Sequence, residues 1–173
     1  MEIVENLAQW QETFESGWLA HFKETGETNF KLYPTMKNTR QPAGPAINLS
    51  QSRLALISSA GGYLRDSQPP FDGPNPLGDY SIRRFPVTTP FSDIAYEHTH
   101  YDHTAVNTDP QVLLPLLHLA EMVEQGAIGE LSPSVISFMG YQPDVPQVLA
   151  QTIPAILEAA KAEQIDAALL VPS

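Results

Sequence analysis

The chain has 173 residues, of which 42% are hydrophobic, enough for one compact domain with a substantial core and too few for two comfortable ones. Nine basic against 20 acidic side chains give a net charge of −11, which disfavours nucleic acid and anionic membrane surfaces as partners. The absence of cysteine removes disulfides, thiolate metal sites and thiol nucleophiles from the chemistry of these residues. The amino terminus lacks the pattern of a signal peptide, and no apolar run of about 18 residues follows, so we expect a cytoplasmic protein without membrane contact.

Residues 1–25 predict an amphipathic helix with an aromatic face. Its apolar side chains recur at spacings of three and four residues: Ile3, Leu7, Trp10, Phe14, Trp18 and Phe22. Such a stripe is more often core packing than a surface that grips a partner, although both interpretations stay open. Glycines and prolines then indicate a connector, so we assign residues 1–49 to an N-terminal helix and connector.

Two strands are predicted in the first half of the remaining chain. Residues 53–59 form a short apolar run that ends in small residues, typical of a buried strand that leaves its sheet through a tight turn. Residues 66–90 carry six prolines, too many for a helix or a central strand, and predict an ordered, functional loop. A second strand at residues 93–97 runs directly into a cluster of histidines.

Two helices and two strands follow. Asp109 and Pro110 favour the start of a helix that ends at Gly126, with Pro115 early enough to be tolerated. Its expected buried stripe is Leu113, Leu116, Leu117, Ala120 and Val123. Residues 135–140 predict a third strand, and Asp144 precedes a helix over 146–164 that Pro154 should kink. Residues 167–171 predict a fourth buried strand at the end of the chain.

Short apolar strands that alternate with amphipathic helices indicate an α/β fold. We expect residues 50–173 to form a single domain with a mostly parallel sheet and helices on both faces. This would be a Rossmann-like layered sandwich that lacks its last helix. Ligands of such sheets bind at the carboxyl ends of the strands. A dinucleotide is disfavoured, because the segment from Ser59 to Gly62 lacks the glycine spacing that wraps a pyrophosphate.

The histidine cluster is the densest chemical signal in the sequence. His98 and His100 lie one residue apart after a predicted strand, so their side chains are expected to point the same way, and Asp102 is placed to hold an imidazole in one tautomer. With His103, these letters also match the H-x-H-x-D-H signature of zinc-dependent metallo-β-lactamase-fold hydrolases. That superfamily needs further ligands downstream, and only His118 follows here. A zinc hydrolase using His98, His100, Asp102 and His103 is therefore kept as an alternative.

Several blocks of sequence, in order, resemble the selenoprotein B subunits of the glycine, sarcosine, betaine and D-proline reductases. The blocks are the strand and small residues at 54–62, Gln68 to Asp72, Gly78 to Arg83, His98 to Asp102, 107–110 with its helix, 126–133, 137–141 and the final strand. No block is decisive alone. Their order and spacing together make the resemblance specific over residues 50–173.

The resemblance implies a reductive cleavage of a C–N bond in a small amine or amino acid. In this family a selenocysteine or cysteine just beyond the last strand attacks the α-carbon, so we expect that residue immediately after Ser173 in an intact relative. His98 and His100 would donate protons to the leaving amine, with Asp102 orienting one of them. Arg83 would pair with a substrate carboxylate, and Asp79 and Ser81 would make further polar contacts.

Whether the chain ends at a recoded UGA codon or ends naturally after Ser173 is left open, and the genomic sequence downstream would decide it. As given, the chain has no redox nucleophile, so it is interpreted as either a shortened oxidoreductase or a non-catalytic member. No cofactor is evident beyond that selenocysteine or cysteine, or zinc in the alternative. Other reductase subunits are the expected partners, homo-oligomerisation stays open, and a binding or assembly subunit is a third hypothesis.

Overall fold

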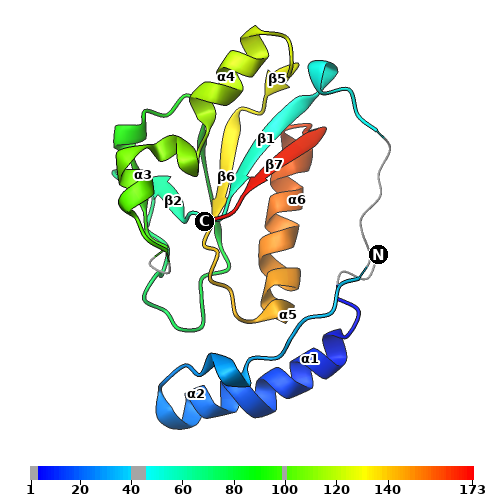
Figure 1. Ribbon diagram of the computed structural model, residues 1–173, viewed down its shortest axis with the longest axis vertical. Coiled ribbons are helices and arrows are strands. Elements are labelled where there is room, and N and C mark those ends of the chain that lie inside the picture. Colours follow the sequence, from blue (N-terminus) through cyan, green and yellow to red (C-terminus); the bar gives the residue numbers. More distant parts are fainter. Residues whose placement is uncertain (1–3, 40–45, 99–100) are drawn as a thin grey trace. The chain divides into compact units, whose positions relative to one another are not determined.

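The computed structural model describes residues 4–39, 46–98 and 101–173. They form two compact units, Met1–Pro45 and Ala46–Ser173, and each unit is treated by itself below. The larger unit is an α/β domain with a mostly parallel sheet and helices on both faces (Figure 1). This confirms the fold class predicted from the sequence. No helix in the described ranges is long and apolar enough to cross a membrane.

The sheet of the larger unit is built around β1 (Arg53–Ser58). On one side β1 pairs in parallel along its length with β7 (Ala167–Val171). On the other side it pairs in parallel with β5 (Glu130–Leu131) near its start and with β6 (Ser134–Phe138) near its end. The edge strand β3 (Ile82–Pro86) pairs antiparallel with β6. Within the described residues, β3 and β7 are therefore the two edges of the sheet.

Alternating side chains of β1 build a core on each face of the sheet, as the period of two residues requires. Leu54 and Leu56 belong to a core that includes Leu116 and Leu119 of α4 (Leu116–Glu124). Ala55 and Ile57 face the opposite way, toward Ala159 and Ile156 of α6 (Ile153–Ala162). Helices therefore cover both faces of the sheet (Figure 1).

The second predicted strand is present but lies outside the main sheet. Gly61 follows the end of β1 with a φ of 65°, a left-handed conformation that favours glycine and turns the chain away from the sheet. β2 (Gly62–Leu64) therefore pairs antiparallel with β4 (Ile94–Tyr96) as a separate two-stranded ribbon. The strand predicted at residues 93–97 is therefore present as β4, outside the mostly parallel sheet.

The predicted helix after Asp109 is interrupted. Asp109 does accept a hydrogen bond from the Gln111 amide and Pro110 occupies the first turn, but this turn is a 3₁₀ segment at Pro110–Val112. Pro115 has a ψ of 46° and stands before α4 rather than inside it, because proline cannot donate the helical hydrogen bond and clashes with the preceding turn. The break rotates the buried stripe, so Leu117 is 57% exposed and Leu114 is fully buried instead.

Two shorter helices complete the larger unit. α3 (Thr104–Thr108) was not predicted. α5 (Val145–Gln147) begins after Asp144, whose side chain accepts from the Gln147 amide, as its position before the helix suggested. A π-helical turn at Val148–Thr152 then precedes α6, which carries Pro154 in its first turn. The predicted disturbance at Pro154 is thus a π-helical turn on its amino-terminal side.

Two further predictions need correction. Residues 82–86 of the expected loop form the edge strand β3, which is compatible with a proline at its end because an edge strand has fewer obligatory amide donors. The final strand β7 is not buried. Leu169 is 36% exposed and Leu170 is 69% exposed, although both are apolar.

The smaller unit is an aromatic helical element. α1 (Leu7–Phe14) continues through a π-helical turn at Glu15–Leu19 into α2 (Ala20–Thr25). Its aromatic rings are spaced four residues apart and stack in succession: Trp10 on Phe14, Phe14 on Trp18 and Trp18 on Phe22, with interplanar angles of 14–15°. An α-helix takes about 3.6 residues per turn, so the wider π-helical turn helps rings at a strict spacing of four to stay in line.

The aromatic face of this helix is packed rather than exposed. Trp10, Phe14 and Trp18 are at most 2% exposed, and all three rings contact Tyr33 of the following segment edge-on. Trp10 also donates from its indole nitrogen to the Pro34 carbonyl over 3.0 Å. The hypothesis that this face grips a partner therefore receives no support from its geometry.

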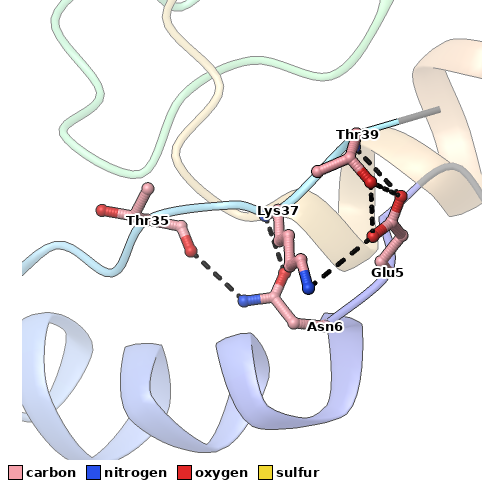
Figure 2. Close-up of polar contacts among 5 residues, drawn as sticks. All are labelled: Glu5, Asn6, Thr35, Lys37 and Thr39. Atoms are coloured by element: carbon pink, nitrogen blue, oxygen red, sulfur yellow. Dashed lines mark hydrogen bonds and ion pairs between the residues drawn. The ribbon is translucent and has the colours of Figure 1, made fainter. Parts of the chain in front are cut away.

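Polar contacts fix the returning segment beside the start of α1, as Figure 2 shows. Asn6 donates to the Thr35 carbonyl and accepts from the Lys37 amide. Glu5 accepts hydrogen bonds from the backbone and hydroxyl of Thr39 and lies 4.0 Å from the Lys37 ammonium. These contacts close the small unit around its own aromatic core.

Candidate functional site

The carboxyl ends of the three parallel strands β1, β6 and β7 border a cavity of about 630 Å³. Its walls combine apolar side chains on the α6 face of the sheet with small polar residues beyond the strand ends. The lining residues are Ile57, Ser59, His98, Phe138, Gly140, Leu170, Val171, Pro172 and Ser173. A site at this edge of a parallel sheet is where ligands of α/β domains usually bind, because side chains from several strands converge there.

Among the predicted site residues that the structure describes, His98 is the one in the lining of this cavity. It follows β4 and is only 6% exposed. The imidazole lies against Gly140, where an added Cβ would stand 2.8 Å from Nε2. The backbone of His98 lies equally close to Gly61, where a Cβ would stand 2.9 Å from the His98 amide nitrogen. Two glycines therefore make the space in which this histidine is held.

A neighbouring aromatic pair holds the His98 segment in place. The Nε2 of His103 donates to the main-chain carbonyl of His98 over 2.8 Å, which assigns the proton on His103 to Nε2 in this arrangement. The Tyr101 ring meets His98 edge-on at 5.3 Å and lies 4.4 Å from the His103 ring. Burial raises the pKa of Tyr101 to about 12, so it stays a neutral hydrogen-bond donor, here to the Ala60 carbonyl.

The other members of the histidine cluster are placed differently. Asp102 is exposed and accepts hydrogen bonds from the amide and the hydroxyl of Thr104 at the start of α3. These hydrogen bonds lower the pKa of Asp102 below its ordinary value. His100 lies outside the described residues. Its predicted role as a proton donor, and that of Asp102 as an orienting group, stay predictions.

The zinc alternative finds no support in this geometry. Across residues 4–39, 46–98 and 101–173, no three histidine, aspartate or glutamate side chains are grouped so as to hold a metal ion. Of the four ligands in that hypothesis, Asp102 is occupied at a helix start and one nitrogen of His103 is occupied by a carbonyl. His100, the remaining member beside His98, lies outside the described residues.

The three predicted substrate contacts lie together, but at the β3 edge and not in the lining of the cavity. Arg83 donates to the carbonyls of Pro69 and Pro70 and to the Ser81 hydroxyl over 2.8–3.1 Å. Its guanidinium carbon also stands 4.4 Å from the centre of the Phe71 ring. These contacts hold the proline-rich segment against the sheet and engage the guanidinium edge that a substrate carboxylate would need.

Asp79 and Ser81 extend the same arrangement. The Asp79 carboxylate accepts hydrogen bonds from the amide and hydroxyl of Ser81 and from the Asp72 amide. Burial alone would raise the pKa of Asp79, but these hydrogen bonds and the charge of Arg83 outweigh it and lower the pKa. In this structure the group braces a loop, and its predicted role in substrate binding remains to be tested.

Sequence reasoning missed the residues that share the cavity with His98. Ser59 and Gly140 end two of the predicted strands and Ser173 lies two residues after a third, so the rule that ligands bind at strand ends was the signal that could have found them. The end of the chain is fixed there: the Ser173 amide donates to the Ser59 hydroxyl over 2.9 Å, and the two hydroxyls are 3.1 Å apart. Figure 1 shows the carboxyl terminus beside the ends of β1 and β6.

The cavity offers a defined set of chemical groups. The described lining contains one imidazole and two serine hydroxyls beside apolar side chains, and no aspartate, glutamate, lysine or arginine. An imidazole can donate or accept a proton near neutral pH. Hydroxyls can bind an ammonium or carboxylate group of a small ligand, whose carbon atoms would contact Ile57, Phe138 and Leu170.

Comparison with known proteins identifies a family. Residues 22–173 match the family model for glycine/sarcosine/betaine reductase selenoprotein B (GRDB). The chain is 31% identical over 122 residues to the D-proline reductase subunit gamma of Acetoanaerobium sticklandii, covering 70% of this chain and 49% of that protein. It is 28% identical over 126 residues to the sarcosine reductase complex component B subunit beta of Peptoclostridium acidaminophilum, covering 68% of this chain and 28% of that protein.

The chain thus spans about half, or less, of the length of these two relatives. No solved structure matches it. The family model covers the whole α/β unit with its cavity and reaches back into the smaller unit. The chain therefore belongs to the glycine/sarcosine/betaine reductase selenoprotein B family.

Proposed function

We propose that this protein acts as a subunit of a reductase complex that cleaves a C–N bond in a small amine or amino acid, with the substrate bound in the cavity beside His98. Membership of the family supports the reaction class, and two relatives are named as subunits of D-proline and sarcosine reductases. The observation that carries the proposal is a buried imidazole in a cavity at the carboxyl ends of three parallel strands.

His98 is assigned the role of proton donor to the leaving nitrogen. When the C–N bond breaks, its electron pair leaves with nitrogen, and a proton on that nitrogen makes an amine a far better leaving group. His98 is held for this task from two sides, by the glycines against which it packs and by the hydrogen bond from His103 to its carbonyl. Because the imidazole is already held in one position, less entropy is lost in bringing it to the leaving nitrogen.

The reaction also needs a nucleophile that these 173 residues do not provide. They contain no cysteine, so a thiol or selenol that attacks carbon would have to come from outside them. A cavity of about 630 Å³ is within the range of ordinary ligand sites. Its volume accommodates a small amino acid together with a side chain that enters from elsewhere.

Ligand binding by the isolated chain tests the proposal without the rest of the complex. Glycine, sarcosine, betaine and D-proline would be titrated separately while the imidazole C–H signals of the five histidines are followed by NMR. We expect at least one ligand to shift the signals of His98 and leave those of His118 in place, because His118 is exposed on α4.

Paired variants give the control. His98→Gln should weaken that binding at least about tenfold, equivalent to roughly 1.4 kcal/mol, whereas His118→Gln should leave it unchanged. If none of the four ligands shifts His98, or if both variants bind like the parent chain, the cavity is not the substrate site.

A further inference from the structure

We propose that the open edge of β7 pairs antiparallel with β7 of a second copy of this chain, and that the second copy completes the wall of the cavity. This inference rests on the proposed function in one respect only, namely that the cavity binds a ligand. It begins from an anomaly of the larger unit: β7 is entirely apolar, yet Leu169 and Leu170 are 36% and 69% exposed.

The edge at β7 lacks the usual protection against pairing with another chain. Exposed edge strands normally carry charged residues, prolines or bulges, or are covered by a loop. β7 reads Ala-Ala-Leu-Leu-Val, without charge or proline. The opposite edge of the same sheet has charge, a proline and a covering segment, since β3 carries Arg83 and Arg84, ends in Pro86 and accepts a hydrogen bond from Gln68 at the Arg84 carbonyl.

The backbone of β7 has hydrogen-bonding groups available on its outer side. The Val171 carbonyl accepts from the Ser59 amide across the β1–β7 pair, so Val171 directs its backbone groups toward β1. Because successive residues of a strand alternate in this direction, Ala168 and Leu170 direct theirs toward the open edge. Each can therefore exchange a pair of hydrogen bonds with a new strand.

The sequence of β7 is complementary to itself when paired antiparallel about Leu169. In that register Ala168 lies opposite Leu170 of the second copy, so a small side chain meets a large exposed one twice across the axis. Ala167 lies opposite Val171 in the same way. No charged residue faces a like charge within the paired segment, and Pro172, which has no amide hydrogen, ends the pairing.

This pairing bears directly on the cavity. Leu170 and Val171 line it, and Leu170 remains largely open to solvent in the single chain. The second copy would bring its Ala167 and Ala168 opposite these two residues and extend the wall past the edge of the sheet. Both cavities of the dimer would be closed by the same two-fold arrangement.

A five-residue strand pair is smaller than a standard protein interface of about 800 Å² per partner, so we expect a reversible dimer with a dissociation constant on the order of micromolar. Sedimentation velocity of the full chain over a wide concentration range would measure it. The result expected is a concentration-dependent shift from monomer to dimer. A chain that stays monomeric at every concentration overturns the proposal.

Variants at the edge identify the surface. Ala168→Pro removes an outward amide without touching the β1 pairing, and Leu170→Lys adds a charge to the strand; each should raise the dissociation constant at least about tenfold. Leu157→Lys is the matched control, because Leu157 is 53% exposed on α6, and it should leave the dimer intact. Circular dichroism checks that each variant is folded, and two edge variants guard against one failing to fold.

The outcomes separate this inference from the proposed function. A dimer that survives both edge variants uses another surface and overturns the inference. If the dimer forms through β7 while none of the four amino-acid or amine ligands binds, the proposed function fails and the interface stands. If a ligand binds to a chain that never dimerises, the proposed function stands and the inference of a β7 interface fails.

Discussion

The two edges of the one sheet differ in almost every respect. At the β3 edge, the segment from Gln68 to Asp72 folds against the strand: Gln68 links the Leu64 amide to the Arg84 carbonyl, and Arg83 binds the carbonyls of Pro69 and Pro70. Arg84 also forms an ion pair with Glu163 after α6. At the β7 edge, an apolar strand meets solvent beside the candidate site.

The difference shows that a charged or polar residue in this fold is not necessarily part of the candidate site. We call the β3 edge the closed edge and the β7 edge the open edge. At the closed edge, charged and polar residues that resemble a binding site form hydrogen bonds with loop carbonyls and amides that would otherwise be unpaired. The open edge carries plain apolar residues and borders the cavity. The sequence pointed toward both His98 and Arg83, and of these two the fold brings only His98 into the cavity.

The largest effect is expected at the closed edge. Phe71→Ala removes a ring that is 2% exposed and lies beneath the Arg83 guanidinium, leaving a cavity under the proline-rich segment. We expect a loss of about 3 to 5 kcal/mol in the free energy of unfolding, measured by urea denaturation. A loss below about 1 kcal/mol would show that this segment contributes little to the stability of the edge.

Arg83→Met should have a smaller effect, about 1 to 2 kcal/mol, because it removes hydrogen bonds to loop carbonyls but keeps part of the packing on Phe71. Arg65→Met is the matched control and should change little, because Arg65 is exposed directly after β2 and its side chain makes one long hydrogen bond, 3.4 Å to the Ile94 carbonyl. The sequence-based role is tested in the same variant. If ligand affinity falls while stability does not, Arg83 contacts the substrate as first predicted.

Acid should weaken the closed edge before it affects the open one. Burial alone would raise the pKa of Glu163, but hydrogen bonds from Ser134 and Arg84 and the charge of Arg84 outweigh it and lower the pKa. The pKa of Asp79 is lowered in the same way by its own hydrogen bonds and by Arg83. In this range of pH the unfolded chain binds more protons than the folded chain. The two carboxylates therefore stabilise the fold fully above their ordinary pKa values of 4.5 for Glu163 and 3.8 for Asp79. This stabilisation is lost as the pH falls through their lowered pKa values in the folded chain.

Chemical denaturation between about pH 6 and pH 3 measures this loss as a falling free energy of unfolding. Asp79→Asn should make the dependence on pH shallower, whereas Asp66→Asn, at an exposed position, should leave its slope as it is. Equal slopes in all three proteins would mean that the Asp79 carboxylate does not stabilise the fold through its charge.

The smallest effect is expected at the open edge. Leu170→Ala removes a side chain that is 69% exposed, so the monomer should lose no more than about 0.5 kcal/mol in its free energy of unfolding. The measurement belongs at a protein concentration below the dimer dissociation constant. A loss comparable to that of Phe71→Ala would show that Leu170 is buried in the monomer, and the contrast between the two edges would disappear.

Local patterns were enough for much of the fold. The strands predicted at residues 53–59, 135–140 and 167–171 are present at Arg53–Ser58, Ser134–Phe138 and Ala167–Val171, because apolar runs too short for a helix satisfy their backbone by pairing in a sheet. Asp109 and Asp144 both begin helical segments through side-chain hydrogen bonds, as their positions suggested. Of the predicted site residues, His98 could be placed at a strand end from its position alone, and it lines the cavity.

Other features depended on contacts between distant segments. The ribbon of β2 and β4 and the engagement of Arg83 by the Pro69 and Pro70 carbonyls join residues whose proximity no local pattern encodes. The consequence of Pro115 was also misjudged, because the burial of Leu114 in place of Leu117 is decided by the surface on which the helix packs.

The sequence by itself determined that this is an α/β domain of the selenoprotein B family, since alternating apolar periods and ordered motifs are local properties of the chain. Only the tertiary structure decided which strand became an open edge, which arginine braces a loop, and which residues share the cavity with His98. These outcomes follow from side-chain packing and hydrogen-bond satisfaction across the whole domain, and a residue's neighbours in sequence do not specify them.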